Sequence, residues 1–154
     1  MSFRLKNILL ALSLFISLTT CKTIANFDQY AYTETTSLKV DVLNLMDKST
    51  ESYSTQTKDI EKTIGDLLKL REYEKHRPND IITYKMWDKM IDSTGQKGIV
   101  GSYFAIWKAD DKEGKVFIQE AKKIVTMGFD LIAELESKKI KPGDAGVQSF
   151  LNKK

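Results

Sequence analysis

Residues 115–139 read KVFIQEAKKIVTMGFDLIAELESKK, and this stretch carries the most regular apolar pattern in the chain. Its apolar and small residues are spaced alternately by four and three positions, as in a heptad seam: Phe117, Ala121, Ile124, Gly128, Leu131 and Leu135. Side chains at these spacings lie on one face of an α-helix. The pattern therefore predicts a helix over 115–139 that packs against other helices along this seam.

Gly128 lies in the middle of this predicted helix. A glycine inside a helix costs about 1 kcal/mol relative to alanine, so its presence needs a reason. On the seam it would let another helix approach closely. We predict that this helix belongs to the same chain and brings an aromatic side chain to the glycine; a dimerisation groove is the alternative.

The segment from residue 26 to residue 75 contains one glycine and no proline, which favours long helices over a β fold with many turns. Steps of four and three recur in two apolar groups: Leu38, Val42 and Leu45, then Ile60, Ile64 and Leu67. Between them lies the polar stretch 47–59. We predict one long helix, continuous or slightly kinked; two helices with a bend near 49–54 are the alternative.

Pro78 marks the next boundary. The residue before a proline disfavours the α conformation, so the long helix is expected to end near residue 75 or 76. A second helix is predicted over 79–93, with Pro78 in its first turn and with Met86 and Met90 filling the core. Three glycines predict a loop over 94–101, and a short helix rich in aromatic residues is expected over 103–109.

These elements predict an all-α fold, a small antiparallel helical bundle with a long N-terminal helix. The bundle is expected to occupy residues 27–140. Residues 141–154 are small, polar and basic, and they are expected to form a flexible tail.

The first 21 residues have a different character. Arg4 and Lys6 form a short positive region, and an apolar stretch of eleven residues, ILLALSLFISL, follows at 8–18. A helix that spans a bilayer needs roughly 20 residues, so this segment predicts a cleaved signal peptide, residues 1–20, rather than a membrane span. The sequence Leu18-Thr19-Thr20-Cys21 then resembles the end of a bacterial lipoprotein signal, with Thr20 where Gly, Ala or Ser is usual.

The resemblance implies that Cys21 is lipidated and becomes the mature N-terminus, with residues 21–26 as a short tether to the membrane. A fatty acid such as palmitate would then hold the protein in the bacterial cell envelope. Lys22 stands where an Asp would retain an enteric lipoprotein in the inner membrane, so the outer membrane, facing the periplasm or the surface, is expected. An ordinary secretory signal that ends near Cys21 is the alternative.

Composition restricts the function further. Cys21 is the only cysteine, so packing rather than an intrachain disulfide must stabilise the domain. The chain has 24 basic and 21 acidic residues, and removal of Arg4 and Lys6 leaves a net charge of about +1. Nothing in this balance indicates a nucleic-acid partner.

Catalytic and metal-ligating residues are scarce. His76 is the only histidine, and Glu72 lies four residues before it on the same helical face. These two residues could share a metal, but a structural zinc site needs four ligands, so we predict no metal, no cofactor and no enzymatic activity.

Four aromatic residues are the candidates for a partner-binding surface: Trp87, Tyr103, Phe104 and Trp107. Tryptophan and tyrosine are enriched at interface hot spots. The alternative, which is favoured, is that these rings close one end of the bundle. The sequence thus predicts a membrane-anchored lipoprotein that acts as a non-enzymatic protein-interaction module. An immunity or exclusion lipoprotein that blocks a toxin or phage component, or a periplasmic binder of a small hydrophobic ligand, is the alternative.

Overall fold

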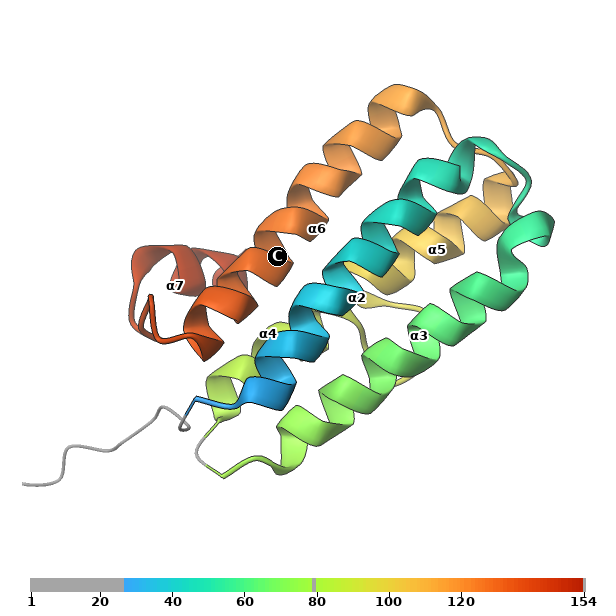
Figure 1. The fold of residues 1–154 in the computed structure, drawn as a ribbon. Coiled ribbons are helices and arrows are strands. Elements are labelled where there is room, and N and C mark those ends of the chain that lie inside the picture. The colour runs from blue at the N-terminus through green and yellow to red at the C-terminus, as the bar shows by residue number, and fades with distance from the viewer. Residues whose placement is uncertain (1–26, 79, 154) are drawn as a thin grey trace, which may run out of the picture.

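The computed structural model describes residues 27–78 and 80–153, and the secondary structure of these residues is entirely helical (Figure 1). In chain order the elements are α2 (Gln29–Asp47), a 3₁₀ turn η1 (Lys48–Thr50), α3 (Tyr53–His76), α4 (Ile81–Met90), α5 (Gly98–Asp110), α6 (Lys115–Glu136) and α7 (Ala145–Asn152). The predicted all-α bundle is confirmed. The signal peptide, Cys21 and the tether lie outside the described residues.

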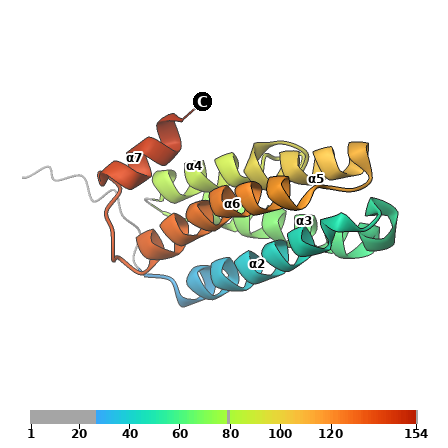
Figure 2. The same cartoon turned by 90° about the horizontal axis from the view of Figure 1, so that it is seen from above.

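The helices pack around one core, with α2 between α6 and α3 and with α4 and α5 behind them (Figures 1 and 2). At one end, which we call the base, α2 and α4 begin and α3 and α6 end. At the opposite end, the apex, η1 connects α2 to α3, and α5 passes to α6. Met86 and Met90 are fully buried, as predicted. No described helix is both long enough and apolar enough to cross a bilayer.

The prediction of a continuous helix through 47–59 is wrong, because the chain reverses direction at the apex. Ser49 is buried there, and its hydroxyl donates to the carbonyl of Met46 at 2.6 Å. The amide of Tyr53 donates to the carbonyl of Asp111 at 2.9 Å, and the amide of Glu113 donates to the carbonyl of Ser49 at 2.8 Å. The loop between α5 and α6 therefore supplies the backbone partners that the turn gives up by leaving the helix.

The predicted ends of α4 are also wrong. The carboxylate of Asp80 accepts a hydrogen bond from the amide of Thr83 at 3.2 Å, so this residue caps α4 and Pro78 lies before the helix instead of in its first turn. At the other end, Ile91 is extended and terminates the helix after Met90.

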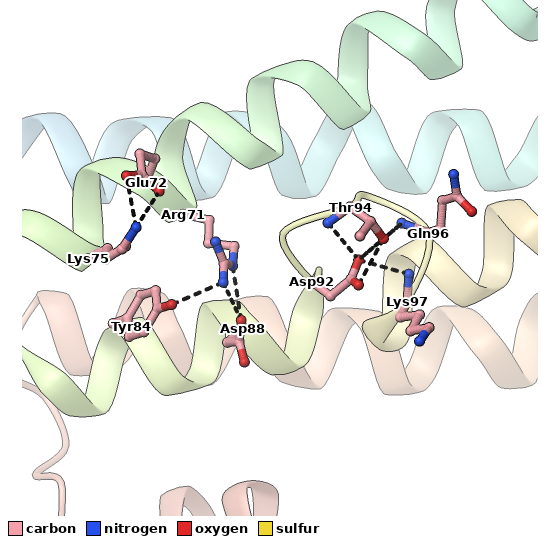
Figure 3. A network of polar contacts seen from close by, with 9 residues as sticks. All are labelled: Arg71, Glu72, Lys75, Tyr84, Asp88, Asp92, Thr94, Gln96 and Lys97. Carbon is pink, nitrogen blue, oxygen red and sulfur yellow. Dashed lines mark hydrogen bonds and ion pairs between the residues drawn. The ribbon is translucent and has the colours of Figure 1, made fainter.

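Helix α5 begins five residues earlier than predicted, at Gly98. The carboxylate of Asp92 accepts hydrogen bonds from the amides of Thr94, Gln96 and Lys97 at 3.0–3.2 Å and so organises the preceding loop (Figure 3). Gly98 has a φ of +81°, and a Cβ atom there would lie 2.9 Å from the backbone of 89–91. Only glycine fits this position. Gly98 was one of the three glycines that predicted a loop, but in the structure it is the residue at which α5 begins.

Helix α6 is present as predicted, and Gly128 and Leu135 of the predicted seam are buried, but near the start of the helix the buried face differs from the seam. The core residues are Ile118, Val125, Phe129, Ile132 and Leu135, whereas Phe117 and Ile124 are 41% and 44% exposed. Two series of apolar residues in α6 have the same seven-residue spacing: positions 117, 124 and 131, and positions 118, 125 and 132. Spacing alone could not show which series is buried.

Gly128 provides the close approach that the sequence indicated, within the same chain. A Cβ atom there would lie 2.3 Å from Sδ of Met90 on α4 and 3.3 Å from the ring of Phe150 on α7. The main neighbour is therefore a methionine, with an aromatic ring beside it.

The predicted flexible tail is wrong, since most of it forms α7. Val147 and Phe150 are buried, and α7 packs against α4 and α6 (Figure 2). The ammonium group of Lys89 donates to the carbonyls of Leu151 and Lys153 at the end of this helix. The local signal for this helix was an apolar residue, Val147, followed three and four positions later by Phe150 and Leu151.

Candidate functional site

A buried ionic cluster surrounds the guanidinium of Arg77 at the base of the bundle. Its Nη1 atom lies 2.7 Å from a carboxylate oxygen of Glu74, 2.7 Å from one of Glu136 and 3.1 Å from one of Asp80. Its Nε atom lies 3.8 Å from a carboxylate oxygen of Asp28. We call these five residues the base cluster. A single arginine thus joins the start of α2, the end of α3, the start of α4 and the end of α6.

Burial governs the electrostatics of this cluster. The side chain of Glu74 is 0% exposed, and those of Glu136, Asp80 and Arg77 are at most 8% exposed. Burial, together with the neighbouring Glu136 carboxylate, raises the pKa of Glu74 to about 8, and burial also raises the pKa of Glu136. Burial alone would lower the pKa of Arg77, but its hydrogen bond to Glu136 and the charge of Glu74 outweigh burial and raise it.

Stability should fall as Glu74 is forced to ionise. Its pKa is about 8 in the folded protein and 4.5 as a free side chain, so between these values the unfolded chain loses a proton that the folded protein keeps. The stability contributed by the neutral carboxyl group is therefore fully present below pH 4.5 and is lost as the pH rises to 8.

Glu74→Gln keeps the shape of the side chain and cannot ionise. We expect urea unfolding to show that this variant gains stability relative to wild type between pH 5 and pH 8, by an amount on the order of a few kcal/mol. Parallel pH profiles for the two proteins would contradict the assignment of a neutral Glu74.

The guanidinium of Arg77 explains why three acidic side chains of the base cluster can lie close together. One oxygen each of Glu74, Asp80 and Glu136 lies within 4.8 Å of the others, a spacing that a divalent cation could use. Arg77 already contacts each of the three, so the guanidinium supplies the positive charge. Because these side chains are buried, a substrate could not reach them, and the chemistry that the cluster supports is the joining of helix ends.

The residues considered as metal ligands in the sequence lie elsewhere. His76 is exposed at the end of α3, and its Nε2 atom lies 2.9 Å from a carboxylate oxygen of Glu72. The base cluster was not anticipated, although Glu74, Arg77 and Asp80 follow one another at intervals of three residues. Glu136 is 59 positions from Arg77, and no local pattern connects them.

The four predicted partner-binding aromatics, Trp87, Tyr103, Phe104 and Trp107, are all buried. Their assignment to a binding surface is wrong, because all four rings pack in the interior, three of them together. Tyr103, Phe104 and Trp107 form consecutive ring contacts on α5, with centroids 5.9 and 6.4 Å apart. Trp87 does not join this group through a ring contact but packs edge to face on Phe129, with centroids 5.8 Å apart.

The exposed apolar side chains of α6 form a different surface, which we call the α6 patch: Val116, Phe117, Ile124 and Met127. The patch runs from the first turn of α6, at the apex, to just past the middle of the helix. The ring of Phe117 stacks on that of buried Tyr103, with centroids 5.7 Å apart and planes 7° apart, which holds this edge of the patch in place. The salt bridge between Glu120 and Lys123 lies among these residues on the same helix.

Three surface grooves are all open to solvent and lined largely by polar side chains. One lies between α4 and α7 beside Lys85 and Asp88, one between α2 and α3 beside Asp41 and Lys62, and one along α6 beside Lys122. None of these three offers the enclosed apolar chamber that a hydrophobic ligand needs.

Comparison of the chain with protein-family models, with curated proteins and with solved structures gives no match. Its function is therefore inferred from the base cluster, the α6 patch and the N-terminal sequence.

Proposed function

We propose that the protein is a lipoprotein, anchored in the bacterial cell envelope through Cys21, whose helical domain binds a protein partner without catalysing a reaction. The observation that carries this proposal is the α6 patch. Exposed apolar side chains that recur along one helix of a folded domain, with charged residues among them, occur at protein–protein interfaces. Lys115, Glu120 and Lys123 are exposed on the same helix and provide these charges.

The position of the α6 patch supports the same role. The described chain begins at the base, whereas the patch runs from the apical end of α6 to just past its middle. An anchor attached at the base would leave this patch accessible to a partner. The burial of the carboxylates of Glu74, Asp80 and Glu136 and the open form of the three described grooves favour binding by this surface over catalysis or the uptake of a hydrophobic ligand.

Lipid anchoring is tested by Cys21→Ser. Wild-type protein is expected in the membrane fraction and should be labelled by a fatty-acid probe, because the cysteine is the acceptor of the lipid. The variant should lose both the labelling and the membrane association. Equal labelling of the two proteins would reject the anchor.

Partner binding is tested with a photoreactive amino acid placed at Ile124, or at Val40 as a control, in cells that produce the full chain. Both side chains are exposed and apolar, but Val40 lies on α2, outside the patch. We expect a discrete crosslinked adduct from position 124 and none from position 40, and Met127→Asp should remove the adduct without changing the melting temperature. Equal crosslinking from both positions would contradict a binding role for the α6 patch.

A further inference from the structure

A second group of exposed apolar side chains lies at the base, and we call it the base rim: Phe27, Tyr30, Tyr73 and Ile81. The rings of Tyr30 and Tyr73 meet edge to face with centroids 5.1 Å apart. The hydroxyl of Tyr73 donates to the carboxylate of Asp28, which belongs to the base cluster. The base rim is therefore built from the segments that Arg77 joins: the start of α2, the end of α3 and the start of α4.

We propose that the base rim docks into the headgroup region of the bilayer that holds the lipid anchor. This inference rests on the lipid anchor of the proposed function and adds a direct contact between the folded domain and the membrane surface. The occupant of this apolar surface is thus a lipid bilayer rather than a protein.

The length of the chain before α2 supports this choice of occupant. Six Cα-to-Cα steps separate Cys21 from Phe27, and they can reach at most roughly 20 Å. The 19 residues of α2 rise about 28 Å from base to apex, which is longer than that reach. A lipid on Cys21 would therefore keep the base, rather than the apex, beside the membrane.

The residue types of the base rim suit a membrane interface. Tyrosine has an apolar ring and a polar tip, and it is enriched where the hydrocarbon of a bilayer meets water. The hydrogen bond to Asp28, with a smaller contribution from burial, raises the pKa of Tyr73 to about 12, so this phenol stays neutral near a lipid surface.

Exposed lysines at the base provide contacts for anionic headgroups. Three exposed lysines, Lys138, Lys139 and Lys141, follow the end of α6, where Glu136 contacts Arg77. Glu72, an exposed acidic residue in the last turns of α3, lies within salt-bridge distance of Lys75 and His76. Lysines beside a membrane are attracted to the negative potential of its anionic lipids.

The test uses the full lipidated protein, reconstituted in vesicles of phosphatidylethanolamine and phosphatidylglycerol, with a nitroxide spin label at a single introduced cysteine. Ile81→Cys reports on the base rim, and Val116→Cys is the matched control at the apex. These side chains are 67% and 77% exposed, and both lie in the first turn of a helix. Tyr30→Cys gives a second position on the base rim. Wild-type protein should take up no label, because its only cysteine carries the lipid.

Oxygen concentrates in the bilayer, whereas a nickel complex stays in water, so the ratio of the two accessibilities of a spin label reports its depth. We expect this ratio to be several-fold higher for the labels at positions 81 and 30 than for the label at position 116. Equal ratios in protein that floats with the vesicles would overturn the docking of the base rim and leave the anchor intact. Wild-type protein that does not float, or that takes up the label, would overturn the anchor and the docking together.

Discussion

Arg77→Met is expected to lower the free energy of unfolding by about 3–5 kcal/mol, because it removes the counter-charge from the buried acidic groups of the base cluster other than neutral Glu74. Glu74, Asp80 and Glu136 are each within 3.1 Å of the guanidinium, and none of them has enough exposure to be solvated by water instead. Urea unfolding followed by circular dichroism at pH 7 measures the loss.

The matched control for this variant is Arg71→Met. Arg71 is also buried, and it joins α3 to α4 (Figure 3). Its Nε atom donates to a carboxylate oxygen of Asp88 at 3.1 Å, and its Nη2 atom donates to the hydroxyl of Tyr84 at 3.0 Å. Its partner Asp88 is half exposed, so water can solvate that carboxylate after the substitution and the expected loss is about 1 kcal/mol or less. Equal losses for the two arginines would contradict the structural role of the base cluster.

A rescue experiment separates electrostatics from packing at Arg77. Adding Glu74→Gln and Glu136→Gln to Arg77→Met removes two of the buried acidic groups. We expect the triple variant to recover part of the lost stability, because amides cannot ionise and so place no buried charge beside the missing arginine. A further loss of stability would instead assign the effect of Arg77→Met to packing.

Trp107→Ala is expected to lower the free energy of unfolding by about 3–5 kcal/mol, through the cavity that a large buried ring leaves behind. Trp107 is fully buried near the apex and packs edge to face on Tyr53, with centroids 5.5 Å apart. Val116→Ala, at an exposed position on α6, should change stability by about 0.5 kcal/mol or less. Thermal melting and urea unfolding give both values.

A comparison of Trp107→Phe with Trp87→Phe isolates the hydrogen bonds from the ring. The Nε1 atom of Trp107 donates to the carbonyls of Glu51 and Asp111, each at 3.1 Å, whereas that of Trp87 has no hydrogen-bond partner among the described residues. Both rings are fully buried, so both variants lose similar volume. We expect Trp107→Phe to cost about 1–2 kcal/mol more. Equal costs would show that these hydrogen bonds add nothing to stability.

The α6 patch illustrates how a regular pattern can indicate the right helix and misplace part of its buried face. The series that contains Phe117 and Ile124 and the series that contains Ile118 and Val125 are equally periodic and equally apolar. Contacts with α2, α4 and α5 select the second series for the core, and Phe117 and Ile124 of the first series become part of the exposed surface on which the proposed function depends.

The sequence by itself determined the helical state of the described chain, the existence of α6, the burial of Met86 and Met90 and the close approach at Gly128. These features follow from the spacing of apolar residues and from the positions of glycine and proline, all of which act within a few residues. The signal peptide and the lipid on Cys21 remain predictions from the sequence, since they lie outside the described residues.

Tertiary structure alone decided the reversal at 48–52, the burial of the four aromatics and the assembly of the base cluster. The turn depends on backbone partners at Asp111 and Glu113, and Arg77 depends on a carboxylate 59 positions away. A hydrogen bond or an ion pair between such distant residues leaves no periodic trace, because its strength comes from burial and geometry that exist only when the helix ends meet.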